Sequence, residues 1–227
     1  MKKTIGILAG MGPRSTAPFI DLVLDECQKQ YGAKNDIDFP KMMIYSLPTP
    51  FYVDRPINHK AMKETIIEGL QKLEKTGVDF IAMPCNFAHI YFEELEKSIS
   101  IPLLNIVDET IKKLPSSSVK ITLFSTSSTY EFGIYQKGIK KYGHQFVFEN
   151  EWQVILNNLI KDIKTSKDND KNVEVLKELI EKVKKEDVQD IIIGCTDLNP
   201  ILKKISTELN IIDSSKCLAE ATIEKIL

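Results

Sequence analysis

Two stretches of this sequence decide the fold: VDFIAMPCN at residues 78–86 and VQDIIIGCT at residues 188–196. Each is an apolar run followed by proline or glycine, then a cysteine, then a small polar residue, and each leads into a helical pattern. A run that is apolar on both faces is typical of a buried strand in a parallel sheet. Because the two stretches lie about 110 positions apart, they predict an internal repeat of one structural unit.

The first strand of each half repeats more weakly. Residues 5–8 lead into Gly10, Met11 and Gly12, and residues 121–124 lead into the serines and threonines of residues 125–129. Strands are expected at residues 4–8, 41–45, 80–83, 103–106, 120–124, 145–148, 191–193 and 211–212, and helices at residues 16–31, 59–76, 92–98, 107–113, 128–141, 151–164, 172–185, 199–209 and 214–227. This alternation predicts an α/β fold of two pseudo-symmetric lobes with mostly parallel sheets and an active site in the cleft between them.

The boundary between the lobes is expected at the turn-rich segment Pro115-Ser116-Ser117-Ser118. The N-terminal lobe then comprises residues 1–115 with 213–227, and the C-terminal lobe comprises residues 116–212. The chain has 227 residues, of which 43% are hydrophobic and 27% charged. These values are near globular averages, so each lobe can bury a core of its own.

Charge and cysteine usage exclude several classes of function. Thirty basic and 32 acidic side chains leave a net charge of −2, which gives no basis for sequence-independent binding to nucleic acid or to an anionic membrane. No apolar segment reaches the ~18 residues of a membrane span. The four cysteines show neither a C-x-x-C zinc spacing nor the density of a small secreted scaffold. We expect a cytoplasmic protein with reduced thiols that acts on a small molecule.

Two of the cysteines are candidates for catalysis. In open α/β sheets, ligands bind outside the carboxyl ends of the strands, where Cys85 and Cys195 are predicted to lie. Asn86 and Thr196 follow them and are good N-cap types, so each thiol is expected beside the positive end of a helix, which favours a thiolate. Cys27 falls within an amphipathic helical pattern, as does Cys217, and both are expected to be structural.

Two thiols on opposite sides of a substrate suit one type of reaction. One thiolate removes a proton from a carbon acid, and the other thiol returns a proton to the opposite face. The charge that develops on the adjoining carboxylate needs hydrogen-bond donors. The candidate donors are Asn86, Thr196, Thr126, Ser128 and Thr129. No cofactor is required for this inversion.

These motifs resemble the aspartate/glutamate racemase superfamily, and more closely its aspartate racemase branch. The resemblance rests on residues 5–13, on Pro84-Cys85-Asn86-x-Ala88-His89 and on Gly194-Cys195-Thr196-Asp197, and it covers essentially the whole chain. It implies an amino-acid racemase without pyridoxal phosphate or metal, commonly a homodimer. It further implies that Cys85 and Cys195 are the acid/base pair, that Asn86 and Thr196 hold the amino and carboxylate groups, and that Met11 and Gly12 line the site.

The resemblance also suggests how a distal carboxylate is held. The segment 50–55, with Asp54 and Arg55, is similar to a family segment whose arginine forms a planar fork suited to a carboxylate. Arg55 would then select a dicarboxylic amino acid, aspartate above glutamate. Lys164 falls near a family lysine that approaches the same group. Arg14 and His89 are further candidates.

Two positions depart from the family pattern. Phe87 stands where the family usually has threonine, which removes a hydroxyl donor and adds an aromatic wall, and Asp197 stands where the family has glutamate. Three alternatives stay open at this point. They are a maleate isomerase, an arylmalonate-decarboxylase-like enzyme on the same fold, and a non-catalytic ligand-binding relative, the last favoured by Phe87.

Overall fold

The computed structural model describes residues 3–52, 55–165 and 169–227. Its chain divides into two compact units. Unit 1 comprises Met1–Glu109 and Ser215–Leu227, and unit 2 comprises Thr110–Ser214. The sequence-based boundaries were placed at residues 115/116 and 212/213, six and two residues from the observed divisions.

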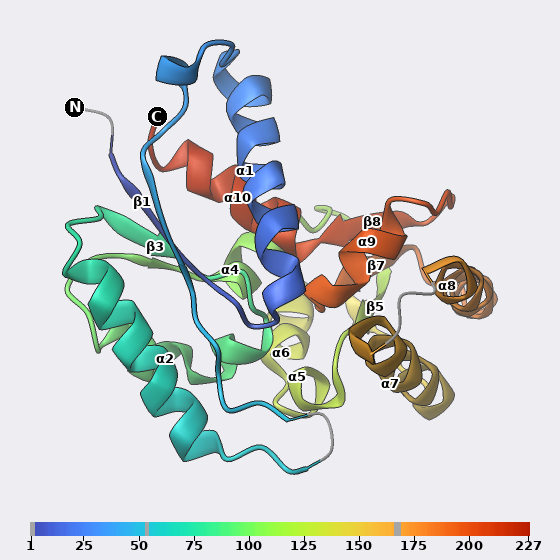
Figure 1. The fold of residues 1–227 in the computed structure, drawn as a ribbon. Coiled ribbons are helices and arrows are strands. Elements are labelled where there is room, and N and C mark those ends of the chain that lie inside the picture. The colour runs from blue at the N-terminus through green and yellow to red at the C-terminus, as the bar shows by residue number, and fades with distance from the viewer. Residues whose placement is uncertain (1–2, 53–54, 166–168) are drawn as a thin grey trace. The chain divides into compact units, whose positions relative to one another are not determined.

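Unit 1 is a parallel sheet covered by helices on both faces. Its strands are β1 (Ile5–Ala9), β2 (Met42–Ser46), β3 (Phe80–Ala82) and β4 (Leu103–Leu104), in the order β2-β1-β3-β4. Its helices are α1 (Thr16–Tyr31), α2 (His59–Glu74), α3 (Phe92–Glu96) and most of α10 (Ser214–Glu224), with 3-10 turns η1 (Pro13–Ser15), η2 (Asp36–Asp38) and η3 (Phe87–Tyr91). Figure 1 shows α2 on one side of this sheet and α1 with α10 on the other.

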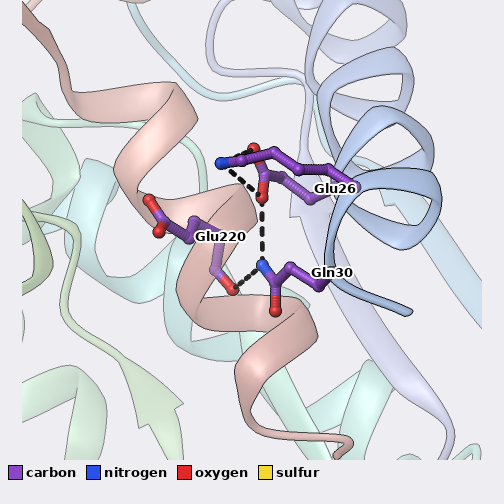
Figure 2. A network of polar contacts seen from close by, with 4 residues as sticks. Glu26, Gln30 and Glu220 are labelled. Carbon is purple, nitrogen blue, oxygen red and sulfur yellow. Dashed lines mark hydrogen bonds and ion pairs between the residues drawn. The ribbon is translucent and has the colours of Figure 1, made fainter. Parts of the chain in front are cut away.

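The C-terminal helix α10 completes unit 1 by packing beside α1. Gln30 of α1 donates from Nε2 to the backbone oxygen of Glu220 at 3.1 Å and to the Glu26 carboxylate at 3.0 Å (Figure 2). The Glu26 side chain is only 4% exposed, and Lys29 lies 3.2 Å from it. A buried carboxylate needs such partners, so this network fixes how the two helices meet.

Unit 2 repeats the plan of unit 1. Its strands are β5 (Lys120–Phe124), β6 (Gln145–Phe146), β7 (Asp190–Ile193) and β8 (Asn210–Asp213), all parallel, in the order β6-β5-β7-β8. Its helices are α5 (Ser127–Glu131), α6 (Ile134–Lys141), α7 (Asn150–Thr165), α8 (Asn169–Lys184) and α9 (Asn199–Leu202), with η4 (Thr196–Leu198), while α4 (Ile106–Ile111) crosses the boundary between the units. Helices α7 and α8 supply most of one hydrophobic cluster, packed with Phe124, Ile191 and Ile193.

The two sheets have equivalent strand orders, so β3 corresponds to β7 and β1 to β5. This confirms the predicted α/β fold and its internal repeat. Two predicted helices differ from the structure. The pattern over residues 128–141 is broken into α5 and α6 because Gly133 adopts a left-handed φ of 66°. The pattern over residues 199–209 ends at Leu202, and further on the Thr207 hydroxyl accepts the amide of Leu209, a local bond that competes with helix.

Among the helices that the structure describes, none combines the length and the apolar character needed to cross a bilayer.

Candidate active site

In unit 1, the loop after β1 and the cysteine after β3 lie at the same edge of the sheet. Strands β1 and β3 are parallel neighbours, with Ile7 beside Ala82, so their carboxyl ends meet there. Gly10 begins the loop with φ +92°, and a Cβ at this residue would lie 2.5 Å from the backbone nitrogen of Leu47. Only glycine fits such a position. The turn therefore delivers Met11 and Gly12, both half-buried, to the edge that carries Cys85.

Cys85 is nearly buried, at 8% exposure, and its backbone is held from both sides. Its amide donates to the Met83 oxygen at 2.8 Å. Its carbonyl oxygen lies 2.8 Å from Nδ1 of His89, and the Ile106 amide donates to Nε2 of the same ring at 3.2 Å. Nε2 also lies 3.3 Å from the Leu104 oxygen, but an Nε2 that accepts the Ile106 amide leaves the proton of a neutral ring on Nδ1, toward the Cys85 oxygen. Burial lowers the pKa of His89, which keeps the ring neutral.

Aromatic side chains pack in the same cluster as Cys85. Phe87 and Tyr91 meet edge to face at 6.0 Å between ring centroids, and the hydroxyl of Tyr91 lies 2.7 Å from Nδ1 of His59. Burial raises the pKa of Tyr91 to about 12, with a smaller contribution from Cys85 and then Glu94. The Tyr91 hydroxyl therefore stays neutral. Phe87 packs against the hydrophobic cluster that contains Cys85.

The remaining unit 1 candidates are less closely tied to the thiol. Asn86 is buried but makes no cap hydrogen bond with its side chain, because the segment after it begins as a 3-10 turn and not as the expected α-helix. Arg55 is exposed, and its guanidinium carbon lies 4.4 Å from the centre of the Tyr52 ring. Asp54, the other charged residue of that segment, lies outside the described residues. Arg14 is exposed in η1.

In unit 2, the equivalent edge carries the hydroxyl-rich loop and Cys195. Strands β5 and β7 are neighbours, with Phe124 beside Ile193. Thr126 caps α5, accepting the Thr129 amide at 3.3 Å, and the two threonine hydroxyls are 3.0 Å apart. Thr129 is buried at 1% exposure, whereas Thr126 and Ser128 are half-buried.

Cys195 has a charged neighbourhood. Its Sγ lies 3.8 Å from Oδ2 of Asp197, and Nζ of Lys164 lies 2.7 Å from the same oxygen. The side chains of Lys164 and Asp197 are 23% and 11% exposed, so this ion pair is largely screened from water. The thiol can donate to a carboxylate whose charge a lysine balances. Thr196 is buried inside the first turn of η4, whose cap position is Cys195 itself, so the predicted cap role of Thr196 is wrong.

Comparison with known proteins identifies the family. Residues 8–222 match the Asp/Glu/Hydantoin racemase family. The chain belongs to this family. It is 52% identical over 224 residues to the broad specificity amino-acid racemase RacX of Bacillus subtilis, covering 98% of both chains. A glutamate racemase of Persephonella marina is 29% identical over 194 residues, covering 81% of this chain and 73% of that protein.

A solved structure agrees with this membership. The aspartate racemase of Picrophilus torridus superposes with a TM-score of 0.81 at 29% identity, covering 99% of this chain and 94% of that one. The resemblance inferred from the two cysteine motifs is confirmed, and with it the class of enzyme, a racemase. The two-lobed α/β fold is that of the structural neighbours.

For a member of the racemase family, the structure adds side chains that sequence reasoning missed. Asp197 is noted in the sequence only as a replacement, yet it contacts both Cys195 and Lys164. Its position two residues after the cysteine is the signal that could have singled it out. Tyr91, which shares a hydrophobic cluster with Cys85, and its partner His59 had no such signal, because their contact depends on how α2 meets η3. Within the described residues, no three His, Cys, Asp or Glu side chains are grouped to hold a metal ion.

Proposed function

We propose that this chain is a cofactor-independent amino-acid racemase in which Cys85 and Cys195 are the two acid/base groups. The observation that carries the proposal is their equivalent placement. Each thiol follows the corresponding strand of a repeated unit, β3 or β7, at the carboxyl edge where α/β folds bind ligands. A single buried cysteine usually serves only as a small apolar residue of the core. Two cysteines in equivalent positions of a repeat indicate a shared function.

The reaction needs no external reactant. One cysteine, as thiolate, takes the Cα proton, and the electron pair of the C–H bond moves toward the α-carboxylate. The other cysteine, as thiol, donates its proton to the opposite face of Cα and becomes the thiolate. The substrate is inverted, and the two cysteines have exchanged protonation states. Each thiol must then address one face of the same carbon.

Stabilising the developing carboxylate charge is the harder part of the chemistry. The half-buried hydroxyls of Thr126 and Ser128, with nearby loop amides, are the proposed donors in unit 2. Asn86 and Thr196, each next to a thiol, are proposed to hold the amino and carboxylate groups. Met11 and Gly12 are proposed to contact the substrate through their backbone. Asp197 and Lys164 act on the substrate only through Cys195, whose thiol they orient.

The proposed substrate range includes aspartate and extends beyond dicarboxylic amino acids. Three observations support this breadth. The Bacillus subtilis relative, 52% identical, is a broad specificity racemase. Phe87 places an aromatic ring where the family usually offers a hydroxyl. Arg55, the candidate clamp for a distal carboxylate, rests on Tyr52 at the surface, and an exposed arginine gives weaker discrimination than a buried one.

The test is incubation of the purified protein in deuterated water with single L-amino acids. Aspartate, glutamate, alanine and lysine serve as the panel. The proposal predicts loss of the Cα proton signal together with formation of the D-enantiomer, unaffected by a chelator. Binding without any Cα exchange across the panel contradicts racemisation and favours a non-catalytic relative. Activity lost on chelation and restored by a divalent cation contradicts the cofactor-independent mechanism.

A further inference from the structure

Gln153, Asn157 and Lys164 lie along one face of α7, with the buried apolar Ile160 between the last two, and these three polar residues are called the polar stripe. With 3.6 residues per turn, positions i, i+4 and i+11 of a helix point the same way. The apolar residues Trp152, Leu156 and Leu159 lie in the hydrophobic cluster of unit 2. Helix α7 therefore uses one set of residues for packing and another for polar contacts.

The polar stripe contacts both of the loops that carry candidate active-site residues in unit 2. At its C-terminal end, Lys164 pairs with Asp197, next to Cys195 after β7. At its N-terminal end, the contacts are with the hydroxyl-rich loop after β5. Gln153 Nε2 donates to the backbone oxygen of Ser125 at 3.0 Å, and the Ser127 hydroxyl donates to Asn157 Oδ1 at 3.0 Å.

The two amides are also joined to each other. Gln153 Nε2 donates its second hydrogen to Asn157 Oδ1 at 3.0 Å, so one carbonyl oxygen receives both Gln153 and Ser127. Gln153 is 8% exposed, and its Oε1 has no hydrogen-bond partner among the described residues. An unsatisfied buried acceptor costs stability. Packing alone does not explain why an amide occupies this position.

We propose that Gln153 and Asn157 are positioning residues for the racemase reaction. They hold residues 125–129 so that the hydroxyls of Thr126 and Ser128 meet the substrate carboxylate. The inference rests on the proposed function, because it assigns the pair to the same loop. It extends that function by making one helix, α7, set the geometry of both the carboxylate-binding loop and the Cys195 thiol.

The decisive comparison is between two adjacent asparagines of α7. Both are exposed. Asn157 accepts the Ser127 hydroxyl, whereas Asn158 lies off the stripe and makes no hydrogen bond to that loop within the part of the chain that the structure describes. Asn157→Ala removes the acceptor of the Ser127 and Gln153 hydrogen bonds. We expect it to lower kcat/KM for L-aspartate, and for the fastest other member of the panel, by about tenfold, mainly through kcat, because the loop hydroxyls are proposed to stabilise charge that develops in the transition state. Asn158→Ala should stay within about twofold of wild type. Asn157→Asp keeps the acceptor oxygens and should recover most of the loss.

A second variant removes the same hydrogen bond from the loop side. Ser127→Ala should reproduce the kcat effect of Asn157→Ala, and it decides the question if the helix variant does not fold. Thermal unfolding is measured for every variant, and we expect the midpoints of all three asparagine variants to stay close to that of wild type. Equal kcat/KM in Asn157→Ala, Asn158→Ala and wild type overturns the inference and leaves racemisation intact. An equal loss in Asn157→Asp and Asn157→Ala also overturns it. A wild-type protein that racemises nothing overturns the proposed function itself.

Discussion

The two cysteines occupy equivalent places in equivalent sheets, yet their surroundings differ. Cys85 lies beside the rings of Phe87 and Tyr91, and its backbone is held by a neutral histidine. Cys195 lies beside the Asp197 carboxylate, which Lys164 neutralises. The repeat has kept the backbone that delivers a thiol to the edge of the sheet and has changed the side chains around it. The surroundings of Cys85 and of Cys195 are therefore not interchangeable.

The difference indicates how each thiol is controlled. An aromatic environment disfavours charge, and the neighbours of Cys85 named here, Phe87, Tyr91 and His89, are neutral. The Asp197 carboxylate instead offers an acceptor that orients a thiol proton. In the proposed reaction, a substrate would meet an aromatic wall beside Cys85 and hydroxyls near Cys195.

The largest effect is expected from replacing either of the two thiols proposed as acid/base groups. Cys85→Ser and Cys195→Ser should each lower racemisation by about a thousandfold or more, since a positioned acid or base contributes 10²–10⁴-fold and serine is a far weaker acid. Cys27→Ser and Cys217→Ser, buried in α1 and α10, are the matched controls and should keep activity. Chiral chromatography measures the rates. Near wild-type racemisation in either active-site variant rules out the two-base mechanism.

The next effect concerns the ion pair beside Cys195. Lys164→Met removes the cation that pairs with the Asp197 carboxylate beside Cys195, and loss of a hydrogen bond to a charged group typically costs about 1.5–3 kcal/mol, or roughly ten- to a hundredfold. We expect that loss in kcat. Lys164→Arg should restore most of it. Lys161→Met, an exposed position of the same helix, is the control. A Lys164→Met protein with unchanged kcat would show that the ion pair is only structural.

The aromatic side chains beside Cys85 should control which substrates are preferred. Phe87→Thr restores the hydroxyl that the family usually has and removes the wall, so the ratio of kcat/KM for aspartate over alanine should rise by roughly three- to tenfold. Tyr91→Phe removes only the hydroxyl that contacts His59 and should leave this ratio within about twofold. If Phe87→Thr does not change the ratio, the ring does not contact the substrate.

The smallest effect concerns stability around Cys85. Burial places the folded-state pKa of His89 below its unfolded value, so the unfolded chain binds more protons as the pH falls below about 6.5. The free energy of unfolding should therefore decrease as the pH is lowered, at most by about 1.4 kcal/mol per pH unit from this group. Urea unfolding at about pH 7.5 and 5.5 measures it, and His89→Gln should show a shallower dependence. Identical slopes in wild type and His89→Gln contradict the assignment.

The strands and the repeat could be predicted from the sequence because buried parallel strands are continuous apolar runs, as at Ile191–Ile193. Helix interiors followed from periodicity, and helix ends were less predictable where a single residue decided them. Gly133, in the left-handed conformation, splits one expected helix, and the segment after Asn86 begins as a 3-10 turn. Such choices depend on tertiary packing more than on local propensity.

Residues of the candidate site could be predicted only where they belong to a recognisable sequence motif. Both cysteines could be identified from the repeated strand-end pattern. The contact of Lys164 with Asp197 could not, because it arises when α7 packs against η4, and these residues are distant in the sequence. The link from Gln153 and Asn157 to the hydroxyl-rich loop is of the same kind. Neither the contact of Lys164 with Asp197 nor the contacts of α7 with this loop follow from a spacing in the sequence.

The central claim, that two different thiols serve opposite faces of one carbon, is tested most directly by the position of the deuterium label early in the reaction. Wild-type protein is incubated with L-aspartate in deuterated water, and both enantiomers are isolated at low conversion; the D-enantiomer is then treated in the same way. The account predicts deuterium in the product enantiomer, delivered by the thiol that had exchanged with solvent, and protium in the recovered substrate. Deuterium appearing equally fast in recovered substrate and product, from both starting enantiomers, would indicate a single exchanging base and would contradict the account.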